Sequence, residues 1–282
     1  MSTPNTVKAQ LQSLIASANA TTGKEDTDLT SAVGSLVEGY KQGGITPSGT
    51  IEITENGTYD VTNYASASVE VQGGSDCVES FLASAVSQVV ISNLNAFGKR
   101  EVELSFPALT NGTSLIYDTV KNTTVEHLIL NIPNGTLYNV NNMINAHNTY
   151  VSETLKRVTL NLDWRYVTQG TQLINNQKGL EIIDGALIDI SSIVSSVTTF
   201  TLANNCPNLI EVRLVANSVN RTLKCVHSPL LSDASIQSIV DAFADMTGQT
   251  SVVLTVHADV KAKIEANPVW LATLTNKNVT LA

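Results

Sequence analysis

A short pattern recurs along the chain at intervals of about 29 residues, and this recurrence limits the possible folds more than any other feature. Four matching stretches begin at Leu115, Met143, Leu173 and Leu202, at spacings of 28, 30 and 29 residues. A strand-like run follows each stretch, at 128–130, 158–160, 181–183 and 212–214. A period of roughly 20–50 residues with one apolar strand per unit predicts a solenoid, because no unit can bury its hydrophobic face alone.

Two of these units share the spacing Leu-x-x-Val-x-Leu, for example at Leu155, Val158 and Leu160. This spacing is similar to that of leucine-rich repeats, in which apolar residues of a short strand point inward and alternate residues point outward. It predicts an irregular leucine-rich-repeat solenoid over residues 75–230.

Three asparagines, Asn145, Asn175 and Asn204, occupy matching places in successive units. An inward amide can bond backbone groups of a turn that would otherwise be buried without a partner. We therefore expect these side chains to point inward and to have a structural role.

Within the N-terminal segment 1–45, residues 5–42 are predicted to form two short helices, because apolar residues recur there at helical spacing. An acid-rich stretch precedes the second stripe and suits the positive end of a helix. Two such helices bury too little surface to be stable alone, so we expect this segment to anchor or oligomerise the chain. The candidate contact residues are Leu11, Leu14, Ile15, Leu29, Val33, Leu36, Val37 and Tyr40.

A small β-module is predicted over residues 46–74, where two β-prone runs flank the turn signal Asn56-Gly57 and a hinge follows at Gly73-Gly74. Residues 231–282 are expected to cap the solenoid. Ser232 or Asp233 suits the N-cap of a helix there, and a strand is expected to follow it. The predicted fold class is therefore α+β: short N-terminal helices, a small β-module, the solenoid and a helix-bearing C-terminal cap.

The charge balance argues against a nucleic-acid partner. The chain carries 25 acidic and 16 basic residues, a net charge of −9, and has no run of Lys or Arg. No apolar run reaches the roughly 18 residues that a membrane span needs, and the N-terminus lacks the pattern of a signal peptide, so neither membrane insertion nor standard secretion is expected. Cys77, Cys206 and Cys225 have no metal-binding spacing and are expected to be buried free thiols.

No motif for catalysis, a cofactor or a metal occurs, so we predict a protein that is not an enzyme and that has no cofactor. The four histidines, His127, His147, His227 and His257, are far apart in sequence and read as packed or solvent-facing residues. A site could still be assembled across adjacent coils, since catalytic triads are defined by geometry.

Two acid pairs, Glu101/Glu103 and Asp184/Asp189, match the residue types of a glycosidase, which keeps a glycan depolymerase open as a less favoured alternative.

The cluster Trp164, Arg165 and Tyr166 has the composition of a recognition patch. The alternative is a tryptophan that packs a loop onto the core.

Three segments carry a family resemblance. Residues 6–44 resemble an N-terminal segment shared by structural proteins of phages and prophages of Gram-positive gut bacteria. Residues 45–71, with ENGTYDVTNYAS, resemble a small β-module of tail and fibre-like proteins of the same phages. Residues 211–264 resemble the closing section of irregular leucine-rich-repeat proteins of the bacterial-surface type.

The resemblance implies a virion structural protein of the tail-fibre, baseplate or head-fibre kind. Its N-terminus would contact other virion proteins and favour a homotrimer, and its repeats would bind a polymer or protein on the host cell surface. A bacterial cell-surface adhesin with the same repeats is the alternative, although the absence of a signal peptide counts against it.

Overall fold

The chain forms two compact units, Met1–Ser48 with Asn63–Ala65 and Gly49–Thr62 with Ser66–Ala282, and each is considered by itself. We call the second unit the two-sheet domain. The computed structural model describes residues 12–20, 25, 27–33, 49–53, 58–60, 67–71, 80–82, 89–91, 94–97, 100–107, 109–118, 121–133, 135, 137–147 and 151–282.

In the first unit, residues 12–20 and 29–33 are helical. The carboxylate of Asp28 accepts hydrogen bonds from the backbone N–H of Ser31 at 2.9 Å and from its hydroxyl at 2.7 Å. These bonds lower the pKa of Asp28. An acid therefore caps the second helix, as expected from the sequence.

Of the predicted contact residues in this unit, Leu14, Leu29 and Val33 are exposed and Ile15 is half-buried. Leu11, Leu36, Val37 and Tyr40 lie outside the described residues.

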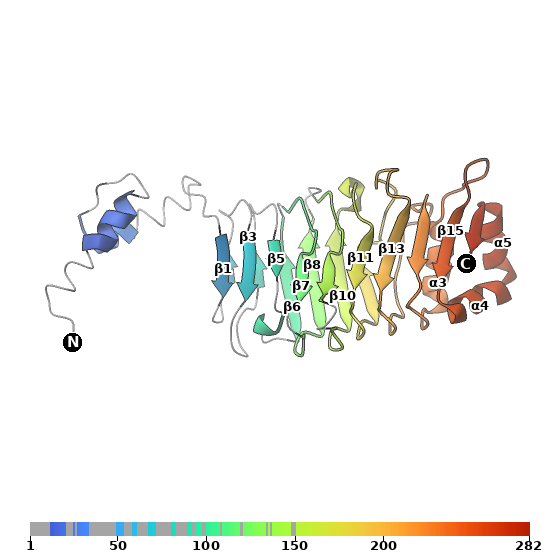
Figure 1. Cartoon of the computed structure of the whole chain (residues 1–282), viewed down its shortest axis with the longest axis horizontal. Coiled ribbons are helices and arrows are strands. Elements are labelled where there is room, and N and C mark those ends of the chain that lie inside the picture. Colours follow the sequence, from blue (N-terminus) through green and yellow to red (C-terminus); the bar gives the residue numbers. More distant parts are fainter. Residues whose placement is uncertain are drawn as a thin grey trace. The chain divides into compact units, whose positions relative to one another are not determined.

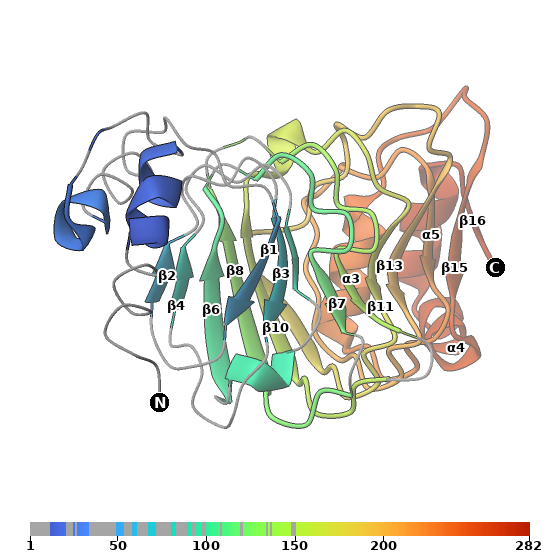
Figure 2. The same ribbon diagram turned by 60° about the vertical axis from the view of Figure 1, so that its left-hand side comes forward.

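The two-sheet domain consists mainly of parallel strands with few helices (Figures 1 and 2). Among the described residues, one sheet has ten strands and the other six. The larger sheet contains, in spatial order, β1 (Gly49–Ile53), β3 (Ala67–Val71), β5 (Val89–Ile91), β7 (Ile116–Asp118), β9 (Ile144–Ala146), β11 (Gln172–Asn175), β13 (Thr199–Asn204), β14 (Thr222–Cys225), β15 (Val252–Val256) and β16 (Val279–Leu281). The smaller contains β2 (Thr58–Asp60), β4 (Ser80–Leu82), β6 (Glu101–Ser105), β8 (His127–Ile132), β10 (Arg157–Leu162) and β12 (Ile182–Gly185).

The predicted fold class is wrong. From β1 to β13 successive strands alternate between the two sheets, so each period supplies two strands where the leucine-rich-repeat prediction expected one. The stretches that begin at Leu115, Met143, Leu173 and Leu202 contain or overlap β7, β9, β11 and β13, and most of the following runs form strands of the other sheet. The result is an α/β-type arrangement of parallel sheets.

The predicted fold class also included a small, separate β-module, and this part of the prediction is wrong. β1 pairs in parallel with β3 and β2 with β4, so these strands do not form a hairpin around the Asn56-Gly57 signal. β3 also pairs with β5, which lies beyond the hinge predicted at Gly73-Gly74. The first strands are therefore the beginning of both sheets.

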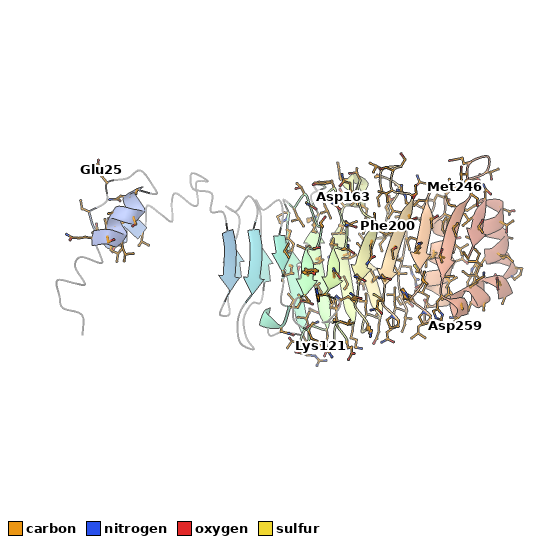
Figure 3. The ribbon with its side chains drawn as sticks, viewed as in Figure 1. Glu25, Lys121, Asp163, Phe200, Met246 and Asp259 are labelled. Atoms are coloured by element: carbon orange, nitrogen blue, oxygen red, sulfur yellow. The ribbon has the colours of Figure 1, made fainter. Side chains whose placement is uncertain are left out.

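Apolar columns between the sheets form the core. In the smaller sheet the register aligns Val102, Leu128, Val158 and Ile183, all at most 2% exposed. In the larger sheet Phe200, fully buried, aligns with Leu223 (Figure 3). Parallel in-register strands place equivalent residues about 4.8 Å apart, so repeating apolar positions stack into continuous columns.

Short helices complete the domain. α3 (Asp233–Ala242) begins at the N-cap Ser232, which confirms the prediction for this helix, and β15 follows it as expected. α4 (Ala258–Ala266) and α5 (Pro268–Asn276) precede β16. The 3-10 helices η1 (Leu94–Phe97) and η2 (Trp164–Tyr166) follow β5 and β10. No helix among the described residues is long and apolar enough to span a membrane.

Candidate functional site

The outward face of the six-stranded sheet carries mostly polar side chains, together with Ile129 and Ile182. Strand β10 shows why: Val158, Leu160 and Leu162 are buried, whereas the alternate residues Arg157, Thr159 and Asn161 are not. The same alternation runs through β6 and β8. The register aligns the outward residues of neighbouring strands, so their side chains meet across the sheet.

A hydrogen-bonded network crosses four strands of this face. His127 Nδ1 lies 2.7 Å from Glu101 Oε2, and His127 Nε2 lies 2.9 Å from Thr159 Oγ1. The Thr159 hydroxyl donates to Asp184 Oδ1 at 2.6 Å, and the Arg157 guanidinium also donates to the Asp184 carboxylate. The network therefore runs from Glu101 to Arg157 through residues that lie far apart in sequence.

The network links an acid, a histidine and a hydroxyl group in the same order as a catalytic triad. Its hydroxyl proton, however, is donated to a different partner. A nucleophilic threonine gives its proton to the histidine, whereas Thr159 donates to Asp184. Burial of Asp184 acts to raise its pKa, but bonds from Arg157 and Thr159 outweigh it and lower the pKa. Because the Thr159 hydroxyl donates to Asp184, the network does not have the proton arrangement of an acyl-transfer triad.

Of the two acid pairs identified in the sequence, Glu101 and Glu103 share one face of β6, whereas Asp184 lies in β12 and Asp189 in the connection after it. Glu103 accepts a hydrogen bond from Asn131 Nδ2 at 2.5 Å and lies on the same face as Glu101. Asp189 instead accepts a bond from the backbone N–H of Ser191, in the connection after β12. A glycosidase general acid needs a raised pKa, which is opposite to the lowered pKa of Asp184.

A ladder of asparagines crosses the ten-stranded sheet. Asn175 Nδ2 donates to Asn145 Oδ1 at 3.0 Å, and Asn204 Nδ2 donates to Asn175 Oδ1 at 2.9 Å. His227 Nδ1 lies 2.9 Å from Asn204 Oδ1 and extends the ladder by one strand. The expectation that these amides point inward to bond backbone groups is wrong, because they are half-buried and bond one another.

A neighbouring asparagine, Asn176, bonds a backbone group instead. Asn176 and Asn205 have φ of 58° and 53°, a left-handed conformation that asparagine tolerates better than most residues. Asn176 Nδ2 donates to the buried carbonyl of Ala146 at 2.9 Å, and Asn205 Nδ2 donates to Asn176 Oδ1 at 2.9 Å. Two parallel ladders of amides therefore hold consecutive strands in register.

The predicted recognition patch is divided by the structure. Trp164 is 4% exposed and packs into the core, which matches the alternative weighed for it. Tyr166 is 52% exposed, and the Arg165 guanidinium lies 5.7 Å from the centre of its ring. Hydrogen bonds from Arg165 lower the pKa of Asp163, the N-cap of η2. The surface part of this patch is therefore Arg165 and Tyr166.

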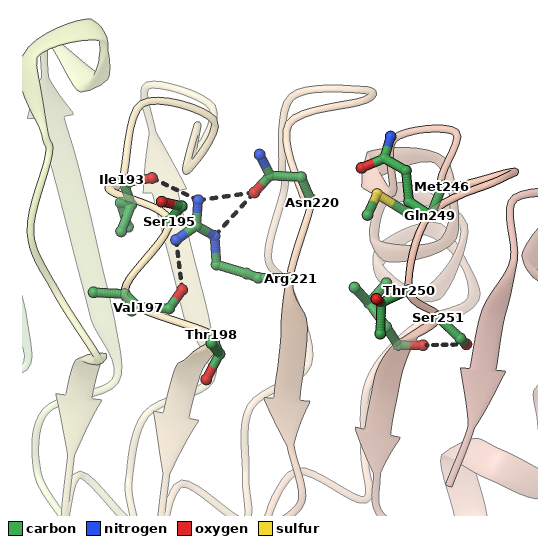
Figure 4. A pocket seen from close by; sticks show the side chains of 11 residues that line it. Ile193, Ser195, Val197, Thr198, Asn220, Arg221, Met246, Gln249, Thr250 and Ser251 are labelled. Carbon is green, nitrogen blue, oxygen red and sulfur yellow. Dashed lines mark hydrogen bonds between the residues drawn. The ribbon is translucent and has the colours of Figure 1, made fainter.

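A hollow that sequence reasoning missed lies at the starts of β13, β14 and β15 (Figure 4). Arg221 lines it and is only 4% exposed. Its five N–H donors bond the carbonyls of Ile193, Val194 and Val197 and the side-chain oxygen of Asn220. Burial lowers the pKa of Arg221, and no carboxylate among the described residues pairs with it.

The lining of this hollow is mostly neutral and rich in hydroxyl groups. Ser195, Thr198, Thr250 and Ser251 line it, and Met246 and Val252 add apolar surface. A second hollow adjoins it, since both share Val197 and Thr198. The signal in the sequence is the Ser and Thr residues directly before β13 and β15, but composition alone does not distinguish a groove from an ordinary surface loop.

The remaining candidates have local roles. Cys206 and Cys225 are buried free thiols, as expected, and burial raises the pKa of each to about 12. Cys77 lies outside the described residues. His257 caps α4 by accepting the N–H of Asp259, and His147 meets the ring of Tyr117 edge to face. Within the described ranges, no group of three His, Cys, Asp or Glu side chains could hold a metal ion.

Together these features define a parallel two-sheet domain with polar ladders on its outer faces and a hydroxyl-lined groove at one edge. No protein-family model, no curated protein and no solved structure matches this chain.

Proposed function

We propose that this chain is a non-enzymatic structural protein of a phage virion whose two-sheet domain binds a polymer on the bacterial cell surface. The proposal takes the virion from the sequence resemblance of residues 6–44 and 45–71. The observation that carries the binding role is the regular array of polar side chains on both sheets, such as the ladder Asn145, Asn175 and Asn204.

A regular array suits a ligand with repeating units. Successive strands offer equivalent groups about 4.8 Å apart, held in place by bonds to their neighbours. Asn161 illustrates the point: it donates one N–H to Asn131 Oδ1 at 2.7 Å and is exposed. Its remaining N–H and its carbonyl have hydrogen-bonding capacity for a ligand. Such preorganisation lowers the entropy cost of binding.

Charge argues for a ligand recognised by hydrogen bonds. The chain has a net charge of −9, so a strongly anionic polymer would be repelled. Neutral hydrogen bonds depend little on ionic strength, whereas ion pairs are screened by salt. We therefore expect a neutral, hydroxyl-rich polymer.

The exposed apolar residues of the first unit support an anchoring role. Leu14 is 57% exposed and Val33 48% exposed, and both belong to the helical stripes that would contact a partner. Exposed apolar side chains at helical spacing suit helix association. We propose that this unit joins copies of the chain, as a trimer, or binds another virion protein.

The experiment is mass spectrometry and antibody labelling of purified phage particles, with prophage-free cells of the same strain as control. We expect the protein in the particle and not on the control cells. Absence from purified particles overturns the virion role, and detection on prophage-free cells favours the surface adhesin instead.

A further inference from the structure

Two adjoining hollows, which share Val197 and Thr198, follow the starts of four neighbouring strands of the ten-stranded sheet. One is lined by residues at the starts of β11 and β13, including Thr171, Gln172 and Thr199. The other continues along the starts of β13, β14 and β15 to Thr250. Four strands at about 4.8 Å spacing give the groove a length of roughly 15 Å. We call it the hydroxyl groove.

The polar groups of this groove are available to a ligand. Ser195, Thr198, Gln249 and Thr250 are exposed, and their side chains form no hydrogen bond with any residue that the structure describes. By contrast, the amides of the ladder Asn145, Asn175 and Asn204 already spend part of their capacity on bonds within the protein. The hydroxyl groove therefore concentrates unused donors and acceptors in a concave surface.

The groove also has a fixed wall and apolar surface. Arg221 ties the loop 193–197 to the start of β14 by using all of its donors. The dashed lines of Figure 4 show its bonds to Ile193, Val197 and Asn220. It is a positioning residue, since no N–H remains for a ligand. Met246, Val197 and Val252 offer apolar contacts beside the hydroxyl groups. Mixed polar and apolar lining is typical of small-molecule sites.

We propose that the hydroxyl groove binds a segment of a neutral glycan chain. Sugar units present hydroxyl groups at their edges and C–H groups on their faces, which match the two kinds of lining. Arg221 is the one charged lining residue, and the donors that would grip an anionic group are already bonded. This inference rests on the proposed function for the source of the glycan.

The test is binding of the full chain to an array of immobilised bacterial cell-wall oligosaccharides, both neutral and acidic. The variant combines Thr198→Val with Thr250→Val, which removes two exposed hydroxyl groups and keeps the side-chain shape. The matched control is Thr275→Val, an exposed threonine on α5 whose hydroxyl bonds only Leu271 O. Circular dichroism checks that all three proteins are folded.

We expect the unaltered chain to bind neutral oligosaccharides, the double variant to bind at least tenfold more weakly, and the control to bind as the unaltered chain does. Equal binding by the double variant overturns the groove as the site and leaves the proposed function standing. Preference for acidic oligosaccharides with a steep loss in salt overturns the ligand class. No binding by the unaltered chain to the array or to bacterial cells overturns both proposals.

Discussion

The hydroxyl oxygen of Ser235 lies 3.0 Å from the backbone nitrogen of Val212 and accepts its hydrogen bond. On one side Glu211 forms an isolated bridge to Ile182 of β12, and Leu214 forms one to Ile188, beyond the end of that strand. On the other side Ser235 and Ser238, three residues apart on α3, bond the N–H groups of Val212 and Leu214. Helix serines thus replace the next strand where the six-stranded sheet ends, which protects its edge.

We predict that Ser235→Ala lowers the free energy of unfolding by about 1–3 kcal/mol, because the buried N–H of Val212 loses its partner. The carbonyl of Ile210 keeps a bond from the Ser232 N–H at 2.9 Å. Urea unfolding measures the change. Ser192→Ala, at an exposed position, is the control and should change stability by less than about 0.5 kcal/mol. Equal effects of the two substitutions would contradict this role of Ser235.

A second prediction concerns Asp118, whose side chain is fully buried in β7. Burial raises its pKa to about 7 despite a hydrogen bond from the Leu94 N–H. Its Oδ2 has no partner among the described residues. The folded state therefore holds this proton more tightly than the unfolded state. The protonated Asp118 carboxyl therefore contributes its full stabilisation below about pH 4. This stabilisation is lost as the pH rises to about 7 and remains absent at higher pH.

Asp118→Asn removes this titration. We expect the stability of the variant relative to the unaltered chain to increase by about 1.4 kcal/mol per pH unit between pH 5 and 6.5, and to level off above pH 7. Urea unfolding at several pH values gives the difference. A difference that does not change with pH would show that Asp118 is ionised in the folded protein throughout.

A third prediction tests the asparagine ladder. Asn145→Ala and Asn175→Ala should each cost about 1 kcal/mol, since each removes bonds between half-buried amides. The double variant should cost less than the sum, with a coupling of about 0.5–1 kcal/mol across the bond between Asn175 Nδ2 and Asn145 Oδ1. Additive effects would mean that the two side chains stabilise the sheet separately.

The fourth prediction concerns Gly179, where consecutive coils approach closely. A Cβ at this position would overlap the carbonyl group of Glu153, which belongs to the backbone and cannot rotate away. We expect Gly179→Ala to destabilise the domain by more than about 3 kcal/mol. Gly248→Ala is the control for added volume, because a Cβ there meets nothing within 4 Å. Its backbone φ of +77° still costs about 1 kcal/mol. Similar stability of the two variants would contradict the close approach.

The period of the sequence predicted part of this fold. It located the apolar runs that form β8, β10 and β12, since alternating burial needs apolar residues at every second position. It did not reveal that the stretch at Met143 is also a strand, because β9 has only three residues, too few for alternation to be recognised. That omission produced the wrong fold class.

The fourth run, 212–214, has the composition of a strand but lacks a strand partner on one side. Its partners there are serines of α3 more than twenty residues later, and no local sequence pattern predicts that a helix replaces the strand.

The network around His127 and the hydroxyl groove were not predicted either, because they too depend on residues that lie far apart in sequence. The link between His127 and Thr159 depends on register between strands, and the hydroxyl groove depends on four separate segments of the chain. Composition indicated a polar surface but did not locate it.

The most direct test of the proposed function is binding of the purified full chain to Gram-positive gut bacteria over a range of salt concentrations, with the chain length of the released surface polymer measured alongside. We predict binding that persists in about 0.5 M salt, because neutral hydrogen bonds are little screened, and a polymer of unchanged length, because the proposed function is not enzymatic. Loss of binding in moderate salt, or shortening of the polymer, would contradict the account.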